Sequence, residues 1–413
     1  MLKSHLKLAL KVLRRRPFFT AVSLVGIGLT LLVLTVAAAI FDHAFSASPP
    51  EVRLERTLLL DRLELSGDHW TSRSGPGYRF LDRYARGLPG VERMAVAAEA
   101  RSAFSYVNGE RVRSYLKRTD ADFWRILSFS FVEGGPFTDE DVASARYVAV
   151  INEATRDRLF AGQPALGRTL ELDGDRFRVV GVVRDVPFLR VVPFSDVWVP
   201  LTAQASDAWR GELRGPMTGI LLAASPADFP RIRSEFQSRL ATVDVSSTPF
   251  KTAWARPQTL LEGFVGLLVM ERRGVDSGMR VVMAVVLGLA LAFMLLPVIN
   301  LVNLNVSRAL ERASEIGVRR AFGASRSQLV AQFVLENVVL ALLGGLVALA
   351  ATELVLRLLT ASALVPYADF HVNLRVFGWG LAFALAFGVL SGAWPAWRLS
   401  RLHPVDALRG GAR

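Results

Sequence analysis

The chain has 413 residues, of which 52% are hydrophobic and 21% are charged, and its mean hydropathy is +0.34. This composition excludes an ordinary soluble protein, and it requires long apolar segments that are kept apart from charged ones. The sequence contains no cysteine, which excludes disulfides, thiol chemistry and lipid attachment through cysteine.

Four apolar runs are long enough to cross about 30 Å of hydrocarbon, namely residues 18–41, 279–306, 329–359 and 376–397. The first run has 24 residues, whereas the apolar region of a cleaved signal peptide has about 7–15, so we interpret it as a retained anchor. The sequence therefore predicts a membrane protein with four transmembrane α-helices. A large α+β extracytoplasmic domain, residues 42–278, is predicted to be inserted between helices 1 and 2.

Basic residues predict the orientation. Six Lys or Arg lie in residues 1–16, five in the loop 307–328 and four in the tail 398–413, against one in the short loop 360–375. The positive-inside rule places residues 1–17, the loop 307–328 and the tail in the cytoplasm, so the loop 360–375 is extracytoplasmic. Residues 42–278 hold 31 basic and 31 acidic residues, so the basic excess reflects topology and argues against a nucleic-acid partner. It suits anionic lipid at the cytoplasmic leaflet instead.

Local patterns in the inserted segment predict strands and helices in alternation. Residues 57–65 alternate in the manner of a strand, and Asn152 is placed to cap a helix that follows a buried strand. The runs 169–172 and 177–183 flank an Asp-Gly pair, which predicts a hairpin. Residues 258–273 are predicted to be helical and to extend the second span outward. The segment is thus expected to be a mixed α+β domain.

A charged helix is predicted directly after the second span. Arg308, Glu311, Arg312, Glu315 and Arg319 share one face of this helix, with opposite charges three and four residues apart. Ser325 is then placed to cap the third apolar helix. A solvated surface helix beside a membrane is the simpler interpretation of such a segment.

The residue string E-I-G-V-R-R-A-F-G-A-S-R, residues 315–326, makes a more specific interpretation possible. Together with Gln332, Phe333 and Glu336, it resembles the cytoplasmic loop and following helix of MacB/FtsX-like ABC transporter permeases. Residues 116–201 are similar to the periplasmic core domain of the same family. The resemblance implies a permease that works as a dimer, of two copies or with a paralogue, in the bacterial inner membrane. It also implies an ABC ATPase subunit as partner and the option of a periplasmic adaptor protein.

In that family the loop resembles a coupling element that docks on the ATPase. By resemblance, this role passes to six residues, Glu315, Gly317, Arg319, Arg320, Gly323 and Ala324. The implied function is to couple ATP hydrolysis by the partner to motion of the periplasmic domain, for export or extrusion of a substrate. The alternative is an FtsX-like signalling or cell-division scaffold that transports nothing.

Two further sets of residues stand out in the apolar runs. Glu336 and Asn337 are membrane-embedded polar residues, which indicate either an ion path or an anchor for the base of the helix. Small residues recur at helical spacing, which favours close helix packing, either against a second copy or within one compact helical domain. The packing glycines are Gly344, Gly345, Gly380, Gly388 and Gly392.

Sequence motifs for catalysis are missing. The five lysines include none in a G-x-x-x-x-G-K-[ST] motif, so we expect no cofactor on this chain and place ATP and Mg²⁺ on the partner ATPase. The five histidines show no metal-ligand spacing, and no G-x-S-x-G occurs. The chain is therefore not expected to be an enzyme by itself.

Overall fold

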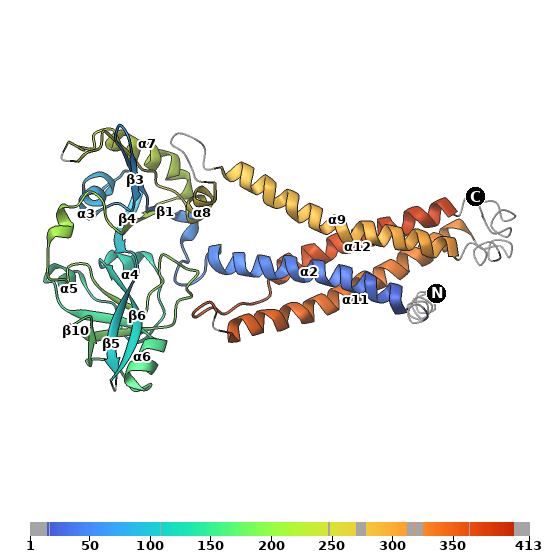
Figure 1. Ribbon diagram of the computed structural model, residues 1–413, viewed down its shortest axis with the longest axis horizontal. Coiled ribbons are helices and arrows are strands. Elements are labelled where there is room, and N and C mark those ends of the chain that lie inside the picture. Colours follow the sequence, from blue (N-terminus) through green and yellow to red (C-terminus); the bar gives the residue numbers. More distant parts are fainter. Residues whose placement is uncertain are drawn as a thin grey trace. The chain divides into compact units, whose positions relative to one another are not determined.

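A computed structural model describes Arg15 and Val318 and the ranges 17–107, 109–246, 248–269, 278–311, 325–362 and 364–399 (Figure 1). These residues form two compact units. One is helical and contains residues 1–43, 281–364 and 369–413, and the other is an α+β domain made of residues 44–280 with the short segment 365–368. Each unit is described separately.

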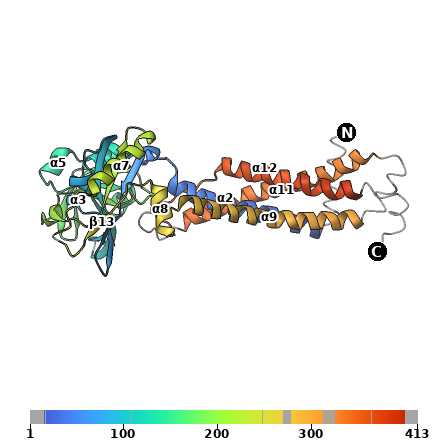
Figure 2. The ribbon, with the colours of Figure 1, turned by 90° about the horizontal axis from the view of Figure 1, so that it is seen from above.

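Four long helices run side by side in the helical unit (Figures 1 and 2). They are α2 (Pro17–Phe45), α9 (Met279–Glu311), α11 (Arg326–Ala361) and α12 (Leu374–Leu399). Within the described residues, three stretches are long and apolar enough to cross a membrane: Pro17–Phe45, Val330–Ala361 and Leu374–Ala393. In α9 the corresponding described apolar stretch is shorter, Met279–Leu295. The chain therefore carries membrane-spanning helices.

The third apolar helix begins where its capping chemistry predicts. The Ser325 side chain accepts a hydrogen bond from the Gln328 backbone N–H, and Gln328 Oε1 accepts one from the Ser325 backbone N–H. This capping box satisfies two of the N–H groups that a helix start leaves unpaired. The expected Ser325 cap is confirmed.

The α+β domain is built on a mixed ten-stranded sheet (Figure 1). Its main path is β1-β12-β4-β6-β11-β8-β10-β7, with β5 added to β6 and β9 to β10, and a separate three-stranded sheet has the order β13-β2-β3. The pairs β8–β10 and β6–β11 are parallel, and the other pairs are antiparallel.

The strands of this domain are β1 (Thr57–Leu60), β2 (Leu63–Ser66), β3 (Thr71–Ser74), β4 (Val91–Ala98), β5 (Arg101–Val107), β6 (Glu110–Thr119), β7 (Phe131–Gly134), β8 (Val148–Asn152), β9 (Thr169–Leu172), β10 (Asp175–Val183), β11 (Val197–Pro200), β12 (Met217–Ala223) and β13 (Thr252–Trp254). The longer helices are α6 (Glu153–Phe160), α7 (Phe229–Leu240) and α8 (Leu260–Leu268), with short turns of helix α3 (Tyr78–Phe80), α4 (Asp122–Ile126) and α5 (Asp139–Ala143). Buried side chains from both faces of the large sheet form three apolar clusters that constitute the core of the domain.

Two local predictions for this domain are confirmed. Strands β9 and β10 form the expected hairpin, with Leu172 opposite Asp175. The Asn152 side chain accepts a hydrogen bond from the Thr155 N–H and so caps α6. Both features depend on residues only a few positions apart.

The strand-like pattern over residues 57–65 corresponds to two strands instead of one continuous strand. The segment forms two strands in different sheets, because β1 pairs with β12 and β2 pairs with β13 and β3. The break falls at Asp61 and Arg62, between the two strands, and the Asp61 carboxylate accepts a hydrogen bond from Gln258 Nε2 at 2.9 Å. Farther along, the helix expected over 258–273 is present as α8 from Leu260 to Leu268, and residues 270–277 lie outside the described part of the chain.

Candidate functional site

The predicted coupling residues lie outside the described part of the chain. Residues 312–317 and 319–324 contain Glu315, Gly317, Arg319, Arg320 and both residues of the pair Gly323-Ala324. Their role stays a prediction from the sequence.

The polar pair of α11 is buried in the helical unit. Glu336 is 4% exposed and Asn337 is 2% exposed. Gln332 Nε2 donates a hydrogen bond to Glu336 Oε1 at 3.2 Å, and Asn337 Nδ2 donates to the Phe333 carbonyl at 3.0 Å. These bonds, each spanning one helical turn, satisfy polar atoms that lipid would leave unpaired. They fit the anchoring interpretation of the pair.

All five predicted packing glycines lie where two helices of this chain approach closely. A Cβ on Gly344 would lie 2.9 Å from Ile27 of α2, one on Gly345 would lie 2.7 Å from Leu381 of α12, and one on Gly380 would lie 3.0 Å from Leu31 of α2. On α12, Gly388 and Gly392 border Asn337. Small residues thus allow α2, α11 and α12 to pack backbone against side chain within one copy.

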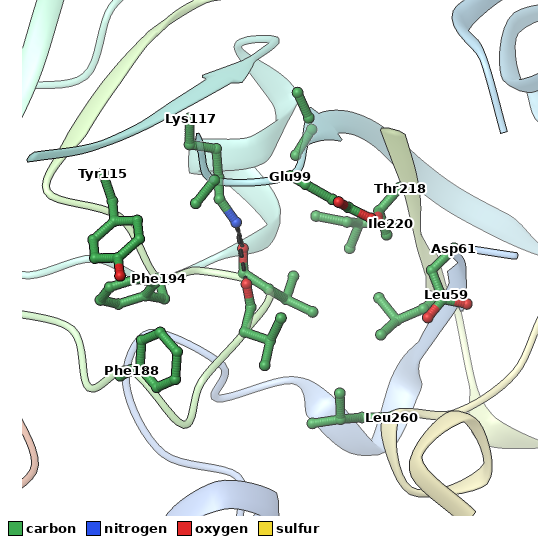
Figure 3. Close-up of a pocket in the computed structure, with 15 residues that line it drawn as sticks. Leu59, Asp61, Glu99, Tyr115, Lys117, Phe188, Phe194, Thr218, Ile220 and Leu260 are labelled. Atoms are coloured by element: carbon green, nitrogen blue, oxygen red, sulfur yellow. Dashed lines mark hydrogen bonds between the residues drawn. The ribbon is translucent and has the colours of Figure 1, made fainter. Parts of the chain in front are cut away.

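A cavity of about 400 Å³ lies in the α+β domain (Figure 3). Tyr115, Phe188 and Phe194 gather on one side of it, and Asp61 faces them across the cavity (Figure 3). Its walls come from the end of β1, the end of β4 with the residues that follow, β6, β12, the start of α8 and the segment 188–194. The cavity lies beside the junction of β4 and β6, whose ladder pairing places Ala97 opposite Thr119.

Lys117 of β6 is the buried basic residue of this cavity. The side chain is 3% exposed, and its Nζ donates hydrogen bonds to the Val191 and Val192 carbonyls at 3.1 and 2.5 Å. Burial disfavours the charged ammonium and lowers the pKa of Lys117 to about 7, although Glu51 and Glu99 act in the opposite direction. The amine therefore holds the segment 187–196 to the sheet.

Lys117 should make the stability of the protein depend on pH. An unfolded chain keeps this amine protonated up to about pH 10.5, whereas the folded protein releases the proton near pH 7. The contribution of Lys117 to stability is therefore lowest below pH 7 and rises between pH 7 and 10.5, by roughly 2 kcal/mol over the first two pH units. In thermal unfolding of the full chain at pH 7 and 9, Lys117→Met should flatten this rise, whereas Lys251→Met, at an exposed lysine, should leave it unchanged. An equal rise in wild type and Lys117→Met would contradict the assignment.

Arg190 ties the same segment to the residues that directly follow α2. Its guanidinium donates to the Ser46 carbonyl at 3.2 Å, to the Ser48 hydroxyl, and to Glu51 Oε2 at 3.0 Å. Arg190 and Glu51 are each 3% exposed. Burial raises the pKa of Glu51, and the Arg190 charge opposes this rise. The result is a buried, hydrogen-bonded ion pair.

The connection between α11 and α12 is joined to the segment as well. The Phe188 N–H donates to the Pro366 carbonyl at 3.0 Å, and the Tyr367 hydroxyl donates to Asp196 Oδ1 at 2.7 Å. Burial and the Asp196 carboxylate raise the pKa of Tyr367 to about 12, so the hydroxyl keeps its proton at neutral pH. Segment 187–196 therefore receives contacts from two places where the chain joins membrane helices.

Four residues of this site were not predicted from the sequence, because none belongs to a recognisable motif: Lys117, Arg190, Asp196 and Tyr367. The one available signal was Lys117, one of only five lysines in the chain, inside an otherwise strand-like stretch.

Two family models of known proteins match separate parts of the chain. The MacB-like periplasmic core domain model matches residues 20–239, and the FtsX-like permease C-terminal model matches residues 287–404. Two Bacillus subtilis (strain 168) relatives are uncharacterized ABC transporter permeases. YvrN is 28% identical over 76% of this chain and 73% of its own length, and YknZ is 25% identical over 80% and 79%.

A third relative is the macrolide export ATP-binding/permease protein MacB of Syntrophobacter fumaroxidans (strain DSM 10017 / MPOB). It is 23% identical over 76% of this chain, which spans 50% of that protein.

Long apolar helices joined to a large α+β domain define an integral membrane protein. The chain belongs to the MacB/FtsX-like family of ABC transporter permeases, and its α+β domain is a MacB-like periplasmic core domain.

Proposed function

We propose that this chain is the transmembrane permease subunit of an ABC transporter and couples ATP hydrolysis by a separate ATPase subunit to motion of its α+β domain. The motion serves export or extrusion of a substrate. The observation that carries the proposal is the course of α11. This helix is continuous over 36 residues, or about 54 Å at 1.5 Å per residue, which exceeds the roughly 30 Å of the hydrocarbon.

The residues at both ends of α11 support this proposal. Its capped start at Ser325 lies near the end of the charged loop 307–328, which we assign to the cytoplasm. Beyond its other end, Pro366 and Tyr367 hydrogen-bond within the α+β domain to the segment that Lys117 and Arg190 hold. A displacement of the loop by a partner would be carried along one continuous helix as far as Ala361, five residues before Pro366.

The proposed topology has four spans, at 18–41, 279–306, 329–359 and 376–397, in the bacterial inner membrane with both termini cytoplasmic. The α+β domain between the first two spans, residues 42–278, is then periplasmic. Basic residues flanking the cytoplasmic ends support this orientation.

The proposed partners are an ABC ATPase, which binds ATP and Mg²⁺, and a second permease copy or paralogue. One relative's name joins an ATP-binding part to a permease part, and this chain spans 50% of that protein. For the second copy, the support is the open face of α9. A Cβ on Gly288 would meet no described atom within 4 Å, and Val281, Leu287 and Leu289 are each more than 60% exposed. A periplasmic adaptor is compatible with the same arrangement.

Reversing charges in the coupling loop tests the proposal. Glu315→Arg and Arg319→Glu should each lower co-purification with the cognate ATPase, or its stimulated ATPase rate, by roughly tenfold, because each places like charges where paired ones are expected. Insertion should be unaffected, since the basic bias of the loop is kept overall. Glu171→Arg, at an exposed residue of the α+β domain, is the matched control. Normal coupling in both loop variants, at normal expression, would reduce the loop to a solvated charged surface.

A further inference from the structure

An exposed apolar face runs along one side of α8. Phe264, Leu267 and Leu268 are 44%, 67% and 59% exposed, and Val269 after the helix is 41% exposed, whereas Val265 is 2% exposed. The three helical residues follow the i, i+3, i+4 spacing of a single helix face. Such a row of large apolar side chains is costly to leave in water, and it marks an interaction surface.

The domain fixes this face firmly. Thr259 and Glu262 form a capping box at the start of α8, and Arg233 Nη2 donates to Glu262 Oε2 at 2.5 Å. From Gly263 to Val269 the sequence has no charged or hydrogen-bonding side chain. The exposed side is therefore a rigid, uncharged surface that belongs to the folded domain.

The position of α8 along the chain indicates what covers this face. The Phe264 ring packs on the Phe45 ring, with centroids 5.1 Å apart, and Phe45 is the last residue of the 29-residue helix α2. At 1.5 Å per residue α2 is about 43 Å long, so with its basic end at the cytoplasmic surface its last turn reaches the outer headgroup region. The next apolar helix begins at Met279, soon after α8 ends.

A second apolar patch borders the same exit of the chain. Phe188 and Val191 are 43% and 69% exposed. Between them, the buried Arg190 holds their segment to Ser46 and Ser48, directly after α2. Two separate parts of the domain thus present apolar side chains beside the residues that leave the membrane.

We propose that the α8 face and the Phe188–Val191 patch lie in the outer headgroup region of the bilayer, with their apolar side chains inserted into the lipid. A short amphipathic helix with an uncharged face binds a membrane in this way, at the boundary between headgroups and acyl chains. The contact holds the base of the α+β domain on the lipid surface. It rests on α2 spanning the membrane and is independent of ATPase coupling.

The absence of cysteine from the sequence allows a direct test with single nitroxide labels. Leu267→Cys, Val191→Cys and Leu166→Cys are introduced one at a time into the full chain in phosphatidylcholine nanodiscs. Leu166 is the matched control, because it is 45% exposed and follows α6, a helix that lies well apart from α8 within the α+β domain (Figure 1). All three sites are exposed, so the substitutions spare the core.

Labels at 267 and 191 should collide more often with oxygen, which concentrates in lipid, than with a water-soluble nickel chelate. The label at 166 should show the reverse preference. A water-like preference at 267 would overturn the proposal. So would spin–spin broadening at 267 that disappears on dilution with unlabelled protein, because this result would identify a second copy as the occupant.

Discussion

Replacing Arg190 with methionine should lower the free energy of unfolding by about 3–5 kcal/mol, because it leaves Glu51 buried without its partner. Both side chains are 3% exposed in the folded domain. For a domain of this size the loss corresponds to a fall of roughly 6–20 °C in the unfolding midpoint. Thermal unfolding of the full chain in detergent, followed by tryptophan fluorescence, measures it.

The pH dependence identifies the cause of this loss. Burial alone raises the pKa of Glu51, and in the variant no guanidinium opposes the rise. The folded variant then holds a proton that the unfolded chain has released, so its deficit relative to wild type should shrink as the pH is lowered from 8 to 5. Adding Glu51→Gln should recover part of the loss.

An exposed ion pair provides the comparison for Arg190. Arg176 and Glu171 are 76% and 58% exposed, so Arg176→Met should cost less than about 1 kcal/mol. Equal, small effects of Arg190→Met and Arg176→Met would show that the buried pair does not hold the residues after α2 to the domain.

Features that depend on short stretches of sequence could be predicted. The long apolar runs indicated membrane helices because the hydrocarbon sets a minimum length. The Asn152 cap and the β9–β10 hairpin followed from local backbone chemistry. The split of residues 57–65 between two sheets did not, since partners on β12 and β13 determine it.

The contacts of the candidate site could not be predicted, because each joins residues that are distant in sequence. Arg190 and Glu51 are 139 positions apart, and Tyr367 and Asp196 are 171 apart. No periodicity or motif in a single sequence specifies such pairs. For the coupling residues the situation is reversed. The segment E-I-G-V-R-R-A-F-G-A-S-R indicates their role by resemblance, whereas their positions lie outside the described residues.

Replacing Gly392 with valine should destabilise the helical unit by about 1–3 kcal/mol through overpacking. A Cβ at this position would lie 2.5 Å from Asn337 Nδ2 and 3.2 Å from the Phe333 carbonyl oxygen. Asn337 is 2% exposed, and its Nδ2 donates to that same carbonyl. The amide therefore cannot turn away without giving up a hydrogen bond in an apolar environment, which adds roughly 0.6 kcal/mol.

Gly378→Val on the same helix is the matched control for Gly392→Val, because a Cβ on Gly378 would meet no described atom within 4 Å. Both substitutions change helix propensity equally, so a difference between them isolates the contact with α11. Size-exclusion profiles recorded after heating in detergent should show a lower midpoint for Gly392→Val alone. Adding Asn337→Ala should recover part of the loss, because it makes room for the valine. Equal midpoints for the two valine variants, or a further loss in the double variant, would mean that α12 does not pack on Asn337 in this way.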